Sequence, residues 1–255
     1  MADVGDPSPS LKMIADAGFS HIHWCHQWCT DFLYSGHEID QIEKWLAEYG
    51  LKTLDLHATD GNEKRWNSDQ EYRRLAGVDL VRNRIEMTAR LGGDAIVMHV
   101  GHEPVLEFVR RSLDELRPLA LERGIRIAVE NGDNFPEMKQ LLSEYEPEYV
   151  GLCYDAGHGN INDDIDNMND VRDRLIVVHL HDNDGIGDLH NPVFSGTLDW
   201  ERLAVVLAGS SYMKPLNMEV TMGNSGFDDP AKFLAHAFET GNRFSGMVEH
   251  ARLDT

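Results

Sequence analysis

Acidic and histidine side chains recur at the ends of apolar runs in this sequence. The run 149–154 ends in Asp155, and His158 follows three residues later. The apolar runs before and after it end in Glu130 and His179. A buried carboxylate without a partner is costly, and several carboxylates that converge without a cation are costlier still. The repetition therefore predicts a cluster of polar groups that serve one purpose.

The residues at these ends combine carboxylates with imidazoles. Carboxylate oxygen and imidazole nitrogen together suit Mn, Co, Zn, Mg or Fe(II), whereas oxygen alone favours Mg or Ca. One histidine at a strand end is more often a hydrogen-bonded core residue, so the joint occurrence on successive strands carries the prediction of a metal site. The candidate residues are His23, His57, His99, Glu130, Asp155, His158, His179, His181, Asp182, Asp188, His190 and Glu219.

Short β-branched segments alternate with longer amphipathic ones from residue 11 onward, which indicates parallel βα units. The closed architecture nearest to this pattern is the (β/α)8 TIM barrel, an α/β fold whose active sites lie at the C-terminal ends of the strands. An open doubly wound sheet is the alternative, but no glycine-rich phosphate loop follows the first strand. We expect strands within 19–24, 51–57, 95–100, 125–130, 150–155, 176–182 and 215–220.

The first barrel strand is therefore expected to be short, irregular or missing, within residues 1–6. No linker-like break interrupts the chain, so residues 1–255 are expected to form one domain. The polar stretch 159–170 predicts a solvated loop. We expect helices within 11–17, 40–49, 69–91, 103–123, 136–145 and 199–208, and a last one from residue 230.

The composition bounds the class of partner. With 23 Lys and Arg against 44 Asp and Glu, the formal net charge is −21, which disfavours nucleic acid because phosphate binding relies on basic residues. Three cysteines fit a reducing cytoplasm better than a disulfide framework. No apolar run approaches the roughly 18 residues that a membrane span needs, and the start has no signal-peptide pattern. We expect a soluble cytoplasmic protein without a membrane partner.

Four motifs, "VENG", "YDAGHGN", "HLHDNDG" with "TLDW", and "NMEV", occur in an order that resembles the xylose-isomerase-like TIM barrels. That superfamily includes sugar isomerases and epimerases and the apurinic endonucleases. The resemblance implies one divalent metal ion (Mn, Mg, Co or Zn). It also implies a small sugar substrate and a possible homo-oligomer. The implied metal ligands are Glu130, Asp155, His179 and Glu219; His179 is preferred to His181 because it stands three residues before the Asp of its motif.

The resemblance further implies that Glu130 and Glu219 move protons and that His158 contacts a substrate oxygen. A metal that chelates a carbonyl and a neighbouring hydroxyl acidifies the C–H bond between them and stabilises an enediolate. Two carboxylates then isomerise or epimerise a sugar, sugar phosphate or keto-polyol. The expected substrate-binding residues are His158, His57, His99, His190, Trp66 and His23.

The sequence is also similar to the trinuclear zinc endonucleases, so a phosphoesterase stays open, as do a keto-polyol dehydratase and a barrel that only binds a ligand. The acidic charge disfavours a DNA groove. Asp188 is a possible ligand of an extra metal. "SGT" stands before "LDW" where the family usually has a Gly-acidic-Gly turn. The endonuclease ligand positions fall on His57, His99, Glu130, Asp155, His158, His179, Asp188, His190 and Glu219.

Overall fold

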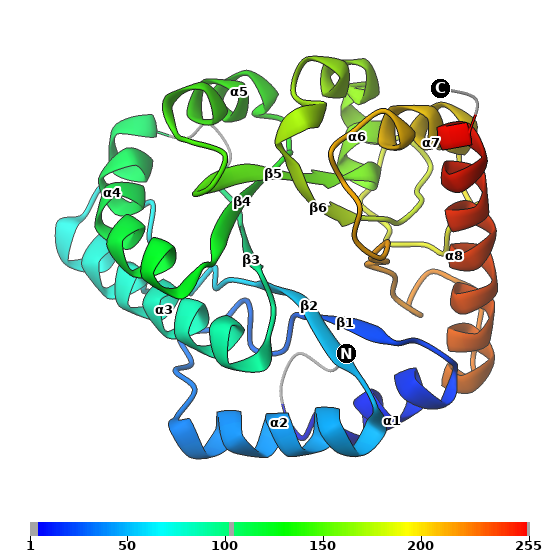
Figure 1. The fold of residues 1–255 in the computed structure, drawn as a ribbon, viewed down its shortest axis with the longest axis horizontal. Coiled ribbons are helices and arrows are strands. Elements are labelled where there is room, and N and C mark those ends of the chain that lie inside the picture. The colour runs from blue at the N-terminus through cyan, green and yellow to red at the C-terminus, as the bar shows by residue number, and fades with distance from the viewer. Residues whose placement is uncertain (1–4, 102–104, 254–255) are drawn as a thin grey trace.

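A single parallel sheet lies at the centre of the computed structural model, which describes residues 5–101 and 105–253 (Figure 1). Its order follows the chain, and helices cover its outer side, so each strand is connected to its neighbour through the helical layer. This is the winding of a TIM barrel, as predicted. The strands are β1 (His21–Trp24), β2 (Lys52–His57), β3 (Ala95–Met98), β4 (Arg126–Glu130), β5 (Val150–Asp155) and β6 (Leu175–His179).

Several helices begin or end at residues that are typical helix caps. The Ser35 side chain accepts a hydrogen bond from the backbone N–H of Glu38, and the Glu38 side chain accepts one from the backbone N–H of Ser35. This capping box starts the second helix at Gly36, whereas the sequence predicted a start at residue 40. Glycines in the left-handed conformation follow α2, α3 and α4. The helices are α1 (Ser8–Asp16), α2 (Gly36–Tyr49), α3 (Glu71–Leu91), α4 (Leu106–Arg123), α5 (Phe135–Glu144), α6 (Ala156–Asn162), α7 (Trp200–Ala208) and α8 (Pro230–Leu253).

Alternate residues along each strand place an apolar layer of side chains directly beneath the polar candidates. Side chains two residues apart point to the same face of a sheet. Val97, Ala128, Cys153 and Val177 belong to one small buried cluster, and each stands two residues before a polar candidate. The polar candidates that they precede are His99, Glu130, Asp155 and His179.

The expected seventh strand, 215–220, is reduced to one parallel bridge between Leu180 and Met218. Its other side has no strand partner in the described part of the chain, so pairing stops after two backbone hydrogen bonds to Leu180. Of the expected first strand, residues 1–4 lie outside the described residues, and residues 5 and 6 form none.

The prediction of a loop over 159–170 is wrong, because this stretch is mostly helical. It contains most of α6 and the 3-10 helix Ile165–Asp170. The Asp155 side chain caps α6 by accepting a hydrogen bond from the His158 backbone N–H. A capped N-terminus stabilises a short helix that composition alone disfavours.

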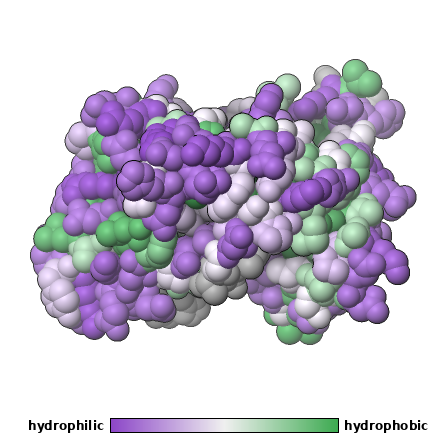
Figure 2. All heavy atoms as spheres, turned by 90° about the horizontal axis from the view of Figure 1, so that it is seen from below, coloured by the Kyte–Doolittle hydropathy of each residue, from purple (hydrophilic) through white to green (hydrophobic). Residues whose placement is uncertain are grey.

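Hydrophilic side chains dominate the face of the molecule shown in Figure 2. Among the described residues, no helix combines the length and the apolar character that a membrane crossing requires.

Candidate metal centre

Four side chains from four successive barrel segments converge at the C-terminal ends of the strands. Glu130, Asp155 and His179 end β4, β5 and β6, and Glu219 follows the bridge at Met218. Each offers one donor atom, and these four atoms lie within 4.8 Å of one another. They are the four residues for which the sequence predicts metal ligation.

Glu130 lies at the centre of this group. Its Oε2 lies 3.2 Å from Nε2 of His99 and 3.4 Å from Nδ1 of His179, while its Oε1 lies 3.4 Å from Nδ1 of His158. Burial alone would raise the pKa of Glu130, but the attraction of His99 and His179 outweighs it and holds this pKa well below its usual range. Glu130 is therefore a carboxylate with imidazoles on three sides.

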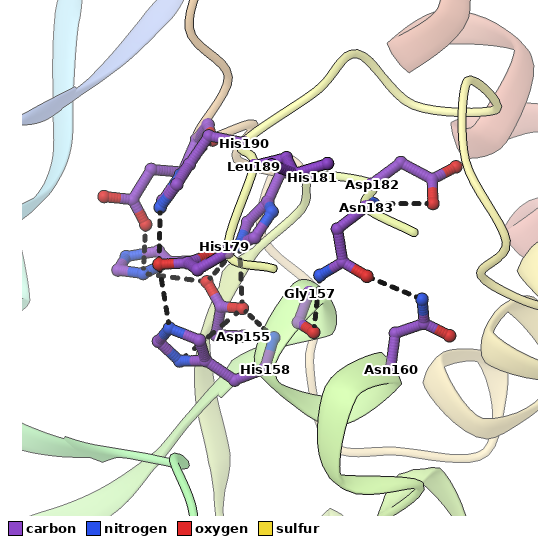
Figure 3. A network of polar contacts seen from close by, with 12 residues as sticks. Asp155, Gly157, His158, Asn160, His179, His181, Asp182, Asn183, Leu189 and His190 are labelled. Carbon is purple, nitrogen blue, oxygen red and sulfur yellow. Dashed lines mark hydrogen bonds and ion pairs between the residues drawn. The ribbon is translucent and has the colours of Figure 1, made fainter. Parts of the chain in front are cut away.

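Asp155 is held by hydrogen bonds to both its backbone and its carboxylate, and Figure 3 shows the carboxylate between His158 and His181. Its Oδ1 accepts from the His158 backbone N–H at 2.7 Å and lies 2.9 Å from Nε2 of His181. The Asn131 side chain pairs with the backbone of Asp155 through two hydrogen bonds. The carboxylate can therefore present Oδ2 toward His179, whose Nδ1 lies 3.9 Å away.

His179 supplies the observation that tests whether a metal ion fits. It is fully buried, and neither ring nitrogen makes a hydrogen bond of acceptable geometry, although its Nδ1 lies 2.8 Å from Oε2 of Glu219. Buried polar atoms nearly always have partners. A buried imidazole whose Nδ1 faces the carboxylates of Glu130, Asp155 and Glu219 without a well-formed hydrogen bond has the donor chemistry of a divalent-metal site.

A second group of donors shares Glu130. His57 Nδ1 donates to the Ala58 carbonyl at 3.1 Å, which leaves Nε2 as an acceptor that lies 3.8 Å from Oε2 of Glu130. Burial, followed by the neighbouring His99, lowers the pKa of His57 to about 3, so this imidazole is neutral. His57, His99 and Glu130 also have donor atoms within 4.8 Å of one another.

Asp188 and His190 form a third group with His158 and His181. Oδ2 of Asp188 lies 3.2 Å from Nε2 of His190 and 3.6 Å from Nε2 of His158. The His190 ring stacks on the His181 ring at a centroid distance of 4.1 Å. Burial opposes protonation of both histidines, but Asp188 raises the pKa of His190 to about 9, and Asp155 together with Asp188 raises the pKa of His158 to about 10. The donor atoms of His181, Asp188 and His190 also lie within 4.8 Å of one another.

The loop that carries Asp188 and His190 is tied to the barrel by Asp182. This buried carboxylate accepts from the Trp200 indole at 2.8 Å and from the backbone N–H groups of Asn183 and Leu198. The sequence includes Asp182 among the candidates for chemistry, but its oxygens are used in holding the loop. The motifs "HLHDNDG" and "TLDW" are thus two halves of one structural unit.

The two remaining predicted substrate contacts lie in different surroundings. His23 Nδ1 is 2.7 Å from Oδ1 of the buried Asp55, and the His23 ring lies 4.6 Å from that of His179. Trp66 is only 2% exposed and donates to the His99 carbonyl, so it supports β3 from the core. The ring of Trp28, a residue that the sequence pattern does not mark as a candidate, lies 4.6 Å from the His57 ring.

A cavity of about 420 Å³ adjoins the cluster, and its lining includes Glu219, His190, His23 and Trp28. Asn131 is a second contributor that sequence reasoning missed, although it directly follows Glu130 in "VENG". Another cavity, of about 660 Å³, lies at the opposite ends of β1 and β2 and is separate from the cluster.

The sequence profile of the xylose isomerase-like TIM barrel family matches residues 11–237. The chain belongs to this family. An uncharacterized protein of Sinorhizobium fredii, y4fM, is 31% identical to it over 95% of this chain and 90% of the relative. A probable endonuclease 4 of Shouchella clausii is 29% identical over 54% of this chain and 55% of the relative.

Several solved structures share the fold at low sequence identity. An L-ribulose 3-epimerase superposes with a TM-score of 0.77 at 16% identity, covering 99% of this chain and 92% of its own. The IolI protein, solved with a bound zinc atom, gives a TM-score of 0.70 at 15% identity over 98% of this chain and 95% of its own. The structural neighbours of this chain thus include sugar epimerases.

Proposed function

We propose that this protein is a divalent-metal-dependent sugar isomerase or epimerase. The observation that carries the proposal is the convergence of Glu130, Asp155, His179 and Glu219 within 4.8 Å beside a cavity of ligand size. These four residues would hold the ion. A divalent ion there would polarise the carbonyl and adjacent hydroxyl oxygens of a bound sugar and so acidify the C–H bond between them.

Glu219 and Glu130 have different roles in proton transfer in this proposal. Glu219 lines the cavity, and its side chain is 23% exposed, so it can reach a substrate carbon. Burial raises the pKa of Glu219, but the attraction of His179 outweighs this effect and holds the pKa well below its usual range. Glu219 is therefore ionised and can accept a proton. Glu130 is the partner acid or base, and His99, whose Nε2 lies 3.2 Å from its Oε2, can pass its proton on.

The remaining site residues would orient the substrate. His158 donates from Nδ1 to the Asn131 carbonyl, so its Nε2, which lies 3.6 Å from Oδ2 of Asp188, is the nitrogen that would face a hydroxyl oxygen. His57, His99, His190 and His23 are polar contacts around the same space, and Asp188 is the candidate ligand of an extra ion. The polypeptide is proposed to act as one domain, and a cytoplasmic location stays a prediction.

The test is exchange of solvent deuterium into a panel of ketoses and aldoses. The protein is loaded with Mn²⁺ or Mg²⁺ in D₂O, and incorporation at the carbon next to the carbonyl is followed by mass spectrometry and NMR. We expect exchange with at least one sugar, and Glu219→Gln should abolish it while the fold is kept. Wild-type exchange in Glu219→Gln would remove the assigned role of Glu219.

Metal-assisted phosphoester hydrolysis is the second candidate, because the described residues contain four sets of side chains that could hold a metal ion and three of these sets share Glu130. A hydrolase would use such a cluster to generate hydroxide and to hold a phosphate. The net charge of −21 opposes a DNA substrate. Hydrolysis of bis(p-nitrophenyl) phosphate by zinc-loaded protein, without deuterium exchange into any sugar, would favour this candidate over the first.

A further inference from the structure

The cavity beside the metal centre extends well beyond the polar cluster. At one end it meets Glu219 and His190, and at the other it reaches the helical layer. The far walls come from α8, from α1 and from the chain just after α1. The apolar residues there include Ile14, Phe19, Leu216, Phe233, Leu234 and Ala237.

This extension exists because the sheet is open at one place. β1 pairs with β2 and has no other strand neighbour among the residues that the structure describes. On the far side of the opening, the chain at 216–221 pairs only through the bridge between Leu180 and Met218. In Figure 1 the orange chain between α7 and α8 lies between β6 and β1, with α8 outside it. The interior of the barrel therefore communicates with the space beneath α1 and α8.

The helices close the opening from outside and make it a pocket. The rings of Phe19 and Phe238 pack edge to face at 5.2 Å, which joins the end of α1 to α8. Phe233 and Ala237 are buried on the α8 face that turns toward the pocket, whereas Ala235 between them is exposed. The pocket is thus a built apolar compartment that begins at the candidate catalytic Glu219.

The charges of the lining distinguish between substrate classes. Glu219 is the only Asp or Glu among the described lining residues, and they include no lysine or arginine. Proteins hold a phosphate through cationic side chains or helix N-termini. The N-terminus of α8, whose first turn lines this pocket, is already capped by Asp229, which accepts from the backbone N–H groups of Ala231 and Lys232. Burial lowers the pKa of the lining His21, which disfavours its cationic form. A phosphate at the far end would therefore lack these partners, whereas an alkyl or aryl group would be removed from water there.

We propose that the substrate is a carbohydrate that bears an apolar substituent, such as an alkyl or aryl glycoside, and that this pocket binds the substituent. The proposal rests on the proposed function, because it assumes that the polar head of the same molecule is held at the metal centre. The substrate would thus be a substituted sugar, and the group that enters this pocket would not be a phosphate.

The test is calorimetric titration of zinc-loaded protein with straight-chain hydroxamic acids, from acetohydroxamate to octanohydroxamate. The hydroxamate is a bidentate oxygen chelator that anchors every probe at the metal, so only the alkyl chain varies. We expect Kd to fall about three- to fourfold for each methylene that enters the pocket. A Kd that is independent of chain length would overturn the proposal.

Two variants on α8 form a matched pair. Ala237→Phe places a ring in the pocket and should abolish the dependence on chain length while acetohydroxamate binds as before. Ala235→Phe makes the same change on the exposed face and should keep the dependence. If Ala237→Phe does not fold, Leu234→Ser replaces it and should weaken octanohydroxamate severalfold. Chain-length dependence that survives in the pocket variants would contradict the assignment.

Acetohydroxamate separates this inference from the proposed function. If the protein binds zinc and acetohydroxamate but gains nothing from a longer chain, the metal centre stands and the apolar pocket is refuted. If the protein takes up no zinc, or zinc-loaded protein binds no hydroxamate, the proposed function and this inference fall together.

Discussion

The contact between Gly157 and His181 shows how single residues hold the centre. A Cβ atom on Gly157 would lie 1.8 Å from Cε1 of His181, closer than any real contact. His181 is fully buried and contacts Asp155, so it cannot move aside without releasing that carboxylate. Gly157 of "YDAGH" thus leaves the space that the ring of His181 in "HLHD" occupies, about two dozen residues further along the chain.

Gly157→Ala is therefore expected to destabilise the metal-free protein by about 1–3 kcal/mol, the usual cost of overpacking. It should also weaken metal binding, because Asp155 loses the partner that orients it. Urea unfolding and metal titration measure the two effects. Gly223→Ala is the matched control, since a Cβ atom there meets nothing within 4 Å. Equal stability of the two variants would show that His181 is not locked in place.

At the scale of elements, the loop between β6 and α7 is held by one carboxylate. Trp200 donates its indole N–H to the buried Asp182. Trp200→Phe replaces the indole with a smaller aromatic ring and leaves an oxygen of Asp182 without this donor, which should lower the free energy of unfolding by about 1–3 kcal/mol. Urea unfolding measures the loss, with Trp45→Phe on α2 as the control for a smaller ring. A loss no larger than in the control would mean that the loop does not depend on this bond.

The strand ends could be predicted from sequence because their pattern is local. An apolar residue such as Ala128 or Cys153 stands two positions before each polar one, and a period of two defines a face without knowledge of the fold. The order of the parallel βα units was predictable for the same reason. Donor distances follow from how the strands curve around one another, and no spacing along the chain contains that information.

Three features depend on contacts between distant residues, and the sequence did not reveal them. α6 forms where composition predicts a loop, because Asp155 caps it. Trp28 reaches His57 only after the loop that follows β1 folds back over the barrel mouth. The seventh strand, which reads as a full strand, forms a single bridge because the described chain offers it no second neighbour.

At the scale of the whole molecule, the centre couples stability to pH. The pKa values of His158 and His190, about 10 and about 9, lie above the value near 6.5 of an unfolded histidine. Protonation of these groups therefore stabilises the folded metal-free protein below about pH 6.5, and this stabilisation is lost as pH rises through 9 to 10. A bound metal ion replaces the protons as the partner of the carboxylates.

We expect the Tm of the metal-free protein to fall between pH 6.5 and pH 10 more steeply than that of the metal-loaded protein. The comparison removes the general effect of the acidic surface, because both forms have the same polypeptide, whose formal net charge at pH 7 is −21 without the ion. Differential scanning calorimetry at constant ionic strength provides the curves. Parallel curves would mean that metal binding does not replace the protons on His158 and His190.

The most direct test of the account is the metal content of the protein purified without chelator or an affinity nickel column. Elemental mass spectrometry should find about one exchangeable divalent ion per chain, which Mn²⁺ or Mg²⁺ can replace and which Glu219→Gln retains poorly. Protein that binds no divalent ion would contradict the metal centre itself. About three tightly held zinc ions per chain would contradict the isomerase or epimerase and favour phosphoester hydrolysis.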